Sequence, residues 1–406
     1  MIHLNPRLLL CSLLLALLAL PASAQNEDDP DPVRFDLSAR RGLRLRAFDG
    51  ALDLRAGGRL HLDMGYVDVD RSAQGDTFLL RRARLHLKGR LFKDYRFTLD
   101  GELRNRFGGW RNLHVGYHGI DRTVLRVGNT IAPMGLAQAG SSNFTLFAER
   151  AVSTVLTPGF QTGGLVRHYG RIAGLDNGHW SIALGGFTSP LGKASNDLHD
   201  SEHASFAARG VLAPIARKSR VMHVGGSVEY RSVENGSNYR YRTRAESALL
   251  TTTLGTPNLA DVDDVLTWGV EGLWMYRAWS AQGEFVRAEI NRRTNADPTF
   301  DGYYAELSWV VTGERRRYSR SQGTFGRIEP KRAWGAVQLG LRYSTIDMID
   351  AGVQGGRTKN LTAGLSWYPH SNLKAMFNFI KVDSRRRGTG QRDEPLVFQF
   401  RLQAFL

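Results

Sequence analysis

Basic side chains recur at every second position in one short part of this sequence. They alternate with Ala83, Leu85 and Leu87, and they are Arg82, Arg84, His86 and Lys88. Alternate residues of a β-strand point to opposite faces, so one face of this segment would be charged and the other apolar. Neighbours on one face lie about 6.5–7 Å apart, within a Debye length of about 8 Å at physiological salt, so their potentials add. Such a face would attract anions.

Other alternating segments place further arginines on their polar faces. These are Arg59, Arg96, Arg104 and Arg126. Anion passage needs fixed positive charge along a water-filled lumen, and overlapping weak sites let the anion leave again. The same faces carry Asp63, Asp100 and Glu102. These carboxylates would either pair with the arginines and stiffen a wall, or orient them toward an anion, and both roles remain open.

Arg81 is out of phase with Arg82. An arginine that faces lipid at mid-depth would cost about 2–4 kcal/mol, so Arg81 must lie at a membrane rim or be turned inward by a bulge.

Composition narrows the class of protein. The chain has 406 residues and a net charge of +15, and of its 54 Lys and Arg residues only eight are Lys. At 42% hydrophobic residues it is too apolar for a disordered protein, and its mean hydropathy of −0.31 argues against a polytopic helical membrane protein. Its single cysteine, Cys11, excludes a disulfide framework and cysteine-rich zinc modules.

The N-terminus reads as an export signal. Residues 1–24 combine Arg7, a short apolar run and an Ala-Ser-Ala site, which predicts cleavage after Ala24. Residues 25–50 begin with an acidic, proline-containing stretch and are expected to form a solvated periplasmic arm. No later segment contains 18 uncharged apolar residues, so an exported membrane protein of this sequence would have to be a β-barrel.

Residues 51–406 alternate with period two to the end of the chain. Segments of roughly ten residues give about sixteen strands, joined by short turns that alternate with longer loops. This predicts an all-β protein, a transmembrane antiparallel β-barrel in the bacterial outer membrane. A soluble β-sandwich or propeller would explain the alternation but not the export signal and the long amphipathic strands.

At this point the sequence resembles the phosphate-selective porins O and P. The matching stretches follow in order along the chain: 58–63, 81–89, 95–100, 125–129, 132–136, 141–150, 312–315, 325–330 and 341–344. The resemblance implies a homotrimer of sixteen-stranded barrels, a third external loop folded inward, and an arginine ladder leading to a phosphate site. It also implies that Arg81, Arg82, Ser141 and Ser142 contribute to the constriction.

The inward loop would lie within residues 132–164, a stretch too long and irregular for a strand turn. Ser142 is expected to cap a short helix that presents Phe144, Phe147 and Ala148. The candidate constriction residues are Ser141, Ser142, Asn143, Phe144 and Arg150. The resemblance also implies a lysine in this loop where phosphate affinity is high, yet residues 130–161 contain no Lys, and Arg150 is their only cation. An external lid is the alternative.

Two arginine runs, 315–317 and 385–387, are expected to be solvated, and the second could bind lipopolysaccharide phosphates. The eleven histidines show no metal-binding spacing, and we find neither a nucleophile motif nor a phosphate loop. We therefore expect no enzyme, cofactor, metal or nucleic-acid partner. The favoured hypothesis is a passive porin for phosphate, polyphosphate or chloride, surrounded by outer-membrane lipid and lipopolysaccharide. The alternative is a non-transporting barrel with a plugged lumen, used for adhesion or anchoring.

Overall fold

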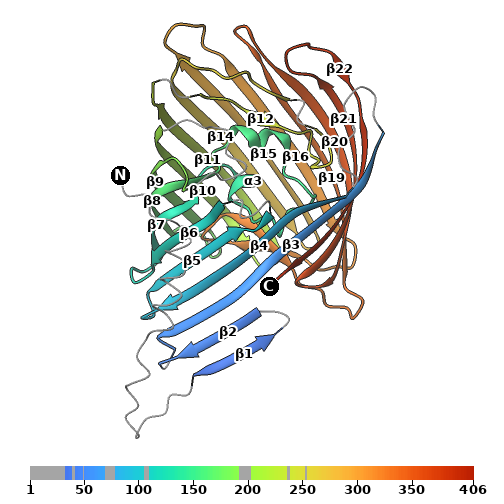
Figure 1. The fold of residues 1–406 in the computed structure, drawn as a ribbon. Helices are drawn as coiled ribbons and strands as arrows, with labels where there is room; N and C mark the ends of the chain where they lie inside the picture. Colours follow the sequence, from blue (N-terminus) through green and yellow to red (C-terminus); the bar gives the residue numbers. More distant parts are fainter. Residues whose placement is uncertain are drawn as a thin grey trace, which may run out of the picture.

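The computed structural model describes residues 33–38, 42–48, 50–68, 78–104, 109–191, 203–235, 238–251 and 254–406. Sixteen antiparallel strands form a closed barrel (Figure 1). They are β3 (Leu52–Asp68), β4 (Phe78–Leu91), β5 (Tyr95–Glu102), β6 (Gly109–Tyr117), β7 (Thr123–Ile131), β8 (Phe160–Arg171), β9 (His179–Thr188), β10 (His203–Arg217), β11 (Arg220–Val233), β14 (Val262–Tyr276), β15 (Trp279–Arg292), β16 (Thr299–Val310), β19 (Ala336–Asp350), β20 (Val353–His370), β21 (Leu373–Arg385) and β23 (Leu396–Phe405). The predicted all-β barrel of about sixteen strands is confirmed.

The barrel closes where its last strand meets its first. β23 pairs with β3 from Leu396 opposite Asp68 to Phe405 opposite Arg59. Because the ring is complete, every barrel strand has a hydrogen-bonded neighbour on both sides, which is the condition for strands to stand in lipid. Among the described residues no helix is long and apolar enough to cross a membrane.

A hairpin extends the sheet before the barrel begins. β1 (Arg34–Ser38) pairs with β2 (Gly42–Ala47), and β2 pairs with the first residues of β3 (Figure 1). Arg44 holds Asp53 of β3 at 2.7 Å, so the hairpin is tied to the barrel by charge as well as by its backbone. The described part of the predicted arm is therefore paired β-structure. The signal segment and its cleavage site after Ala24 lie outside the described residues.

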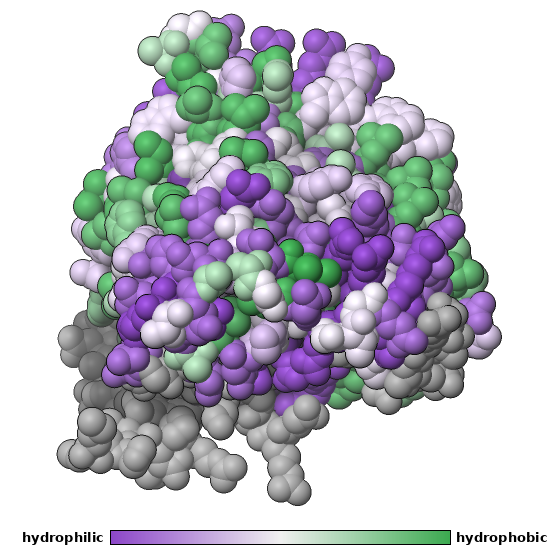
Figure 2. Space-filling model, turned by 90° about the horizontal axis from the view of Figure 1, so that it is seen from above, coloured by the Kyte–Doolittle hydropathy of each residue, from purple (hydrophilic) through white to green (hydrophobic). Residues whose placement is uncertain are grey.

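The two faces of the wall differ as the alternation predicts. On β21, Leu373 and Phe377 are exposed on the outer face, whereas Lys374 and Asn378 on the inner face are buried. From above, hydrophilic residues gather across the centre of the molecule and hydrophobic ones lie along much of its outline (Figure 2). Apolar groups face lipid without cost, and the polar groups inside require partners or water.

Three connections contribute residues to the interior of the barrel. Residues 132–159, between β7 and β8, contain the short helix α3 (Leu136–Ala139) and the 3₁₀ turn η1 (Val152–Leu156). Residues 234–261, between β11 and β14, contain the small strands β12 (Arg242–Thr243) and β13 (Leu254–Gly255). Residues 311–335, between β16 and β19, contain the hairpin of β17 (Arg316–Ser319) and β18 (Thr324–Ile328). A further short strand, β22 (Arg392–Asp393), pairs with the end of β21.

Apolar clusters attach these connections to the wall. Met134, Val152 and Leu156 pack with Tyr241 and with wall residues such as Phe300. Leu136 and Phe325, from two different connections, share a cluster with Leu273 and Met275 of β14. Burying each such side chain contributes about 1.5–3 kcal/mol. The separate apolar clusters inside the barrel therefore stabilise the docked connections.

The third connection, residues 311–335, is longer than the alternation of short turns and long loops predicts for its end of the barrel. Counting strands around the barrel puts residues 311–335 on the same rim as the tight turns at 92–94 and 277–278. That rim was expected to carry short turns alone. The hairpin is compatible with it because its residues turn into the lumen, where Phe325 finds apolar partners.

Candidate functional site

Residues 132–159 lie against the inner face of four strands. We call the inward faces of β19, β20, β21 and β23 the covered wall. Side chains of this wall bind backbone groups of the loop one after another. The pairs are Lys374 Nζ to the Thr145 carbonyl at 2.6 Å, Ser366 Oγ to the Leu146 carbonyl at 3.3 Å, the Ala148 N–H to Asn378 Oδ1 at 2.9 Å, and Gln403 Nε2 to the Asn143 carbonyl at 3.0 Å. The part of the loop at residues 143–148, which has no regular secondary structure, thus has backbone groups satisfied by the wall.

Glycines in the covered wall make room for the loop. Gly340 of β19 and Gly364 of β20 both point inward. A Cβ atom at Gly340 would lie 2.7 Å from Leu146 Cδ2, and one at Gly364 would lie 2.9 Å from Phe147 Cδ1. Glycine inside a strand often marks such a close approach, and here it admits two loop side chains that are almost fully buried.

Glu149 fixes the loop to two strands, β4 and β23, that lie on either side of β3. Its carboxylate accepts hydrogen bonds from Arg81 Nε at 2.8 Å and from Arg401 Nη2 at 2.7 Å. Burial alone would raise the pKa of this carboxyl group, but the charges of Arg81, Arg401 and Arg82 hold its pKa well below the usual range. Glu149 is therefore ionised whenever the loop is docked.

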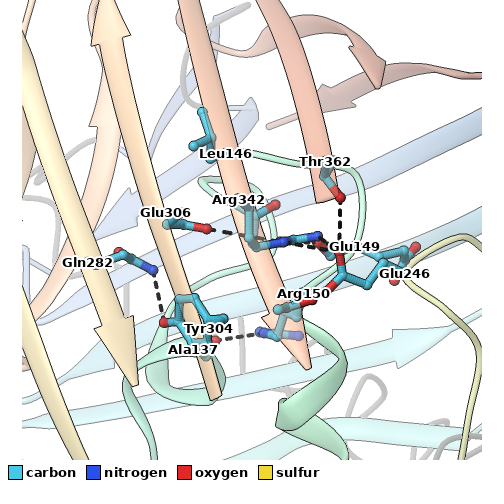
Figure 3. A network of polar contacts seen from close by, with 12 residues as sticks. Ala137, Leu146, Glu149, Arg150, Glu246, Gln282, Tyr304, Glu306, Arg342 and Thr362 are labelled. Carbon is cyan, nitrogen blue, oxygen red and sulfur yellow. Dashed lines mark hydrogen bonds and ion pairs between the residues drawn. The ribbon is translucent and has the colours of Figure 1, made fainter. Parts of the chain in front are cut away.

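Glu246, from residues 234–261, is the second clamp (Figure 3). It accepts hydrogen bonds from the Val152 N–H at 2.9 Å, from Arg342 Nη2 at 2.6 Å and from Thr362 Oγ1 at 3.1 Å. Ser344 donates to the same carboxylate. One buried side chain thereby joins two loops to β19 and β20, and Arg342 reaches on to the Glu149 carbonyl at 3.0 Å.

The start of the loop is fixed by a third carboxylate. Gly135 has a φ of 72°, a left-handed conformation that glycine adopts without strain. The turn directs the N–H groups of Leu136 and Ala137 to Glu284 of β15, at 2.9 and 3.1 Å. Ser142 does not cap a helix, and the expected helix through Phe144 and Phe147 is wrong. The wall side chains bind the backbone groups that a helix would use.

A cavity of about 730 Å³ lies between the loops and the opposite side of the barrel. Thirteen arginines line it: Arg59, Arg81, Arg82, Arg84, Arg104, Arg111, Arg126, Arg150, Arg167, Arg209, Arg240, Arg242 and Arg244. The lining also includes Ser141, Ser142 and the carboxylates Glu149 and Glu246. We call the inward faces of β4, β7 and β8 the open wall, because they supply Arg82, Arg126 and Arg167 to this cavity.

Some of these arginines are neutralised by a carboxylate. Arg84 binds Glu102 at 2.9 Å, Arg59 lies 3.6 Å from Asp100, and Arg209 binds Glu271 at 2.5 Å. Asp100 and Glu102 thus lie beside arginines, as expected. Asp63 has a different partner from the arginines expected for it, since it pairs with Arg401 across the closing seam at 2.5 Å. In these pairs most of the guanidinium charge is balanced at short range.

Other arginines of the cavity have no carboxylate partner. Within the described part of the chain, neither Arg82 nor Arg167 forms a hydrogen bond or an ion pair, and the buried Nε of Arg82 is unsatisfied. Arg126 donates only to Thr130, at 3.1 Å. Arg150 donates to the carbonyls of Ala137 and Gly140, both at 2.7 Å, so it braces the loop while keeping its charge. Arg82, Arg126 and Arg167 thus place positive charge on the open wall without an ion-pair partner among the described residues, and Arg150 adds its charge from the loop.

Of the two positions expected for Arg81, a membrane rim or a bulge that turns it inward, the structure has the bulge. His61 pairs with Arg82 and Leu62 pairs with Leu80, so Arg81 is the extra residue of a β-bulge. The bulge turns its side chain inward to Glu149. Arg59 reaches the same loop through Ser142 Oγ, 3.3 Å from its Nη1.

Several predicted site residues lie elsewhere. Lys88 and Arg96 do not line the cavity. Asn143 and Phe144 face the wall: the Asn143 carbonyl accepts from Gln403, and the Phe144 ring packs on Phe405 at 5.8 Å. The arginine run 315–317, expected to be solvated, contains the buried Arg316, which donates to the Phe144 carbonyl at 3.0 Å. It is buried because its hairpin lies inside the barrel.

Sequence reasoning missed six lining arginines: Arg111, Arg167, Arg209, Arg240, Arg242 and Arg244. The last three alternate at period two within one long connection, a spacing that could have been noticed. Arg167 and Arg209 lie in the middle of strands rich in small residues, with no second arginine two positions away, and only the register shows that they face the lumen.

A closed sixteen-stranded barrel with an apolar outside and a charged lumen narrowed by loops defines an outer-membrane porin. The family model for the phosphate-selective porins O and P matches residues 54–404. The chain belongs to this family, whose members are channels of the outer membrane.

Individual relatives agree with this family. Porin O of Pseudomonas aeruginosa is 26% identical over 421 residues, covering 93% of this chain and 94% of that protein. Among solved structures, OmpT of Vibrio cholerae matches with a TM-score of 0.55 at 10% identity over 88% of this chain and 99% of OmpT, and OmpT is also known in a trimer form. An anion-selective porin from Comamonas acidovorans matches with a TM-score of 0.51 at 13% identity, covering 87% of this chain and all of that one. These structural matches show the fold alone.

Proposed function

We propose that this porin is a passive channel that prefers anions, with phosphate and polyphosphate as its intended solutes. The observation that carries the proposal is the positive charge of Arg82, Arg126 and Arg167 on the open wall, none of which forms an ion pair with a carboxylate among the described residues. A lumen lined by fixed cations without counter-charges concentrates anions and repels cations. The family's phosphate selectivity and the relation to Porin O support the choice of anion.

The shape of the basic lining favours phosphate chains over single small anions. Arginines of the loop at residues 234–261 enter the same cavity as those of the barrel strands, so an extended polyanion would meet several guanidinium groups at once. A guanidinium is planar and binds phosphate oxygens in pairs. The loop at residues 132–159 lacks a lysine, and Arg150 is its one cation. We propose that phosphate is held here by guanidinium groups together with Ser141 and Ser142.

Bilayer recordings test the proposal. Under a KCl gradient, we expect a reversal potential of the sign that chloride permeation gives, and a cation-selective potential would contradict it. Adding millimolar phosphate should then lower the chloride current, and an unchanged current would remove the phosphate claim. Replacing Arg82 and Arg84 with Ala should lower the anion-to-cation permeability ratio. A barrel that passes no current would instead support the non-transporting alternative.

Three further features are part of the proposal. We propose that the chain is exported by residues 1–24 with cleavage after Ala24, that it assembles as a homotrimer, and that lipopolysaccharide contacts its outer face. The trimer form of OmpT supports the second of these. N-terminal sequencing of the mature protein and cross-linking in intact outer membranes test the first two, and a single-barrel mass after cross-linking would contradict the trimer.

A further inference from the structure

Two lysines stand on the lipid-facing side of the barrel near its external rim. Lys359 of β20 and Lys381 of β21 are exposed and belong to the same outer faces as Leu361 and Phe377. The register pairs Lys359 with Asp383 and Lys381 with Leu361. The two lysines are therefore diagonal neighbours across adjacent strands, a position at which Cα atoms lie about 7–8 Å apart.

Neither lysine is neutralised by the protein. In the described part of the chain, neither ammonium group forms an ion pair or a hydrogen bond. Asp383, which lies directly opposite Lys359, pairs instead with Arg392 at 3.2 Å. A charged group at the edge of the hydrocarbon is costly unless it reaches the interface or finds an opposite charge. Two uncompensated lysines side by side thus leave positive charge where the headgroups begin.

The neighbouring strands carry different outward-facing residues at the same height of the barrel. The residue opposite Lys359 on β19 is Thr345. The next residues at this height are Tyr303 on β16 and Phe285 on β15, aromatic residues of the kind found at a membrane interface. One step nearer the rim, Arg287 pairs with Asp301 at 2.6 Å. At this height, of the strands compared, β20 and β21 are the ones that carry cations without an ion-pair partner.

The rim above the lysines adds further positive charge. Arg357 and Arg385 lie opposite each other at the next level. Arg357 is 3.6 Å from Asp347, whereas Arg385 is exposed and forms no ion pair or hydrogen bond within the described residues. Of the run 385–387, Arg386 is held by Asp393 at 3.5 Å. Arg385 therefore extends the patch made by the two lysines.

We propose that Lys359, Lys381 and Arg385 form a binding site for a phosphate group of lipopolysaccharide in the outer leaflet. Charge-assisted hydrogen bonds from an ammonium group to phosphate oxygens span about 2.8 Å, and the long, flexible side chains of two diagonal lysines can bring both ammonium groups to one phosphate. A lipid fits better than free phosphate because Leu361 and Phe379 continue the same faces toward the apolar band, where acyl chains would lie. This site lies outside the channel, since its residues face away from the lumen, and it rests on the proposed contact of lipopolysaccharide with the outer face.

Binding of purified glycolipid to the whole barrel tests the site. The probe is lipopolysaccharide offered to delipidated protein in detergent with EDTA, and bound copies are counted by native mass spectrometry. Each basic residue near a membrane surface contributes about 1 kcal/mol, so the Lys359→Gln/Lys381→Gln double variant should bind about thirtyfold more weakly. Lys359→Arg/Lys381→Arg should retain binding. Arg287→Gln, a cation at the same rim with its own carboxylate, is the matched control and should change binding less than twofold.

Three results would overturn the proposal. They are unchanged binding in the double glutamine variant, an equal loss in Arg287→Gln, and equal binding of enzymatically dephosphorylated glycolipid. Competition by inorganic phosphate at the same concentration as the glycolipid would contradict a lipid site in favour of a free-anion site. Single-channel conductance should be the same in all variants, so failure here is distinguishable from failure of the channel proposal.

Discussion

The covered wall and the open wall use the same kind of side chain for opposite purposes. On the covered wall, Arg401 is held by Asp63 at 2.5 Å and by Glu149 at 2.7 Å, and Arg342 is held by Glu246 at 2.6 Å. On the open wall, Arg82 and Arg167 have no such partner among the described residues. The difference is the carboxylate, because both walls carry buried arginines facing the lumen.

This contrast gives a physical criterion for the role of a lumen cation. A paired guanidinium loses most of its field at short range and gains rigidity, so it works as a fastener for a loop. An unpaired guanidinium beside water keeps its field and attracts a mobile anion. Both kinds of arginine matter for the loop at residues 132–159. The paired arginines hold it against the covered wall, and this leaves the cavity open beside the unpaired arginines of the open wall.

Breaking a fastener on the covered wall should have the largest effect. Replacing Glu246 with Ala removes both hydrogen bonds from Arg342 and three further hydrogen bonds to the same carboxylate, from Val152, Ser344 and Thr362. Removing one partner of a buried ion pair costs about 3–5 kcal/mol, which is enough to release the loop while the barrel persists. We expect trypsin to cut the folded variant after Arg150, with the fragments identified by mass spectrometry, while the wild type stays intact. Glu394→Ala, in an exposed pair, is the control, and resistance of the Glu246 variant would contradict the clamp.

A change without any charge should release the same loop more weakly. Gly340→Val places a side chain where a Cβ alone would lie 2.7 Å from Leu146 Cδ2. Overpacking of this kind costs about 1–3 kcal/mol, so we expect partial cleavage after Arg150 under the same digestion. Gly210→Val on β10 is the matched control, because nothing lies within 4 Å of its Cβ position. Equal behaviour of the two valine variants would show that the loop does not dock through Gly340.

On the open wall, the criterion separates two neighbours on one strand. Arg82 is unpaired and Arg84 binds Glu102 at 2.9 Å. A unit charge acts on an ion 4 Å away with about 1 kcal/mol in water, so Arg82→Gln should lower the anion-to-cation permeability ratio about threefold to fivefold. In Arg84→Gln, Glu102 still interacts with Arg111 and the remaining cations. Because the charge of Arg84 was already balanced by Glu102, we expect the permeability ratio to change less than twofold. Reversal potentials in a KCl gradient measure both, and equal effects would refute pairing as the criterion.

How much of this could be predicted from the sequence depends on the range of each contact. Alternation within β4 was enough to place Arg82 and Arg84 on the lumen face, because facing is a property of a single strand. Asp63 was assigned to the arginines near it in sequence, but its partner Arg401 lies 338 residues away across the closing seam. Strand pairing between the two ends of a chain leaves no local signal, so this pair required the register.

The loops were harder to predict than the wall for a related reason. Residues 141–150 contain apolar residues at helical spacing, yet the wall side chains Lys374, Asn378 and Gln403 bind their backbone and favour an extended path. The buried Arg316 looked like part of a solvated run because the sequence does not show that its hairpin turns inward. Inward glycines such as Gly340 were the available signal, because a glycine inside a strand often marks the close approach of another segment.

The smallest expected effect concerns protons. Because the pKa of Glu149 is well below its usual range, this carboxylate stabilises the docked loop at every pH above the unfolded-state pKa, and the stabilisation is lost only as pH falls through the lower folded-state value. Between pH 7 and pH 5 its pairs with Arg81 and Arg401 should therefore persist. We expect amide exchange of residues 143–152, corrected for the intrinsic rate, to be equally slow at both pH values in the wild type and equally faster at both in Glu149→Gln. Histidines that titrate in this range affect both proteins alike. A wild-type loop that exchanged at pH 5 as fast as the variant would mean that Glu149 takes up a proton there, and the clamp would then be a neutral hydrogen bond rather than the ion pair that distinguishes the covered wall.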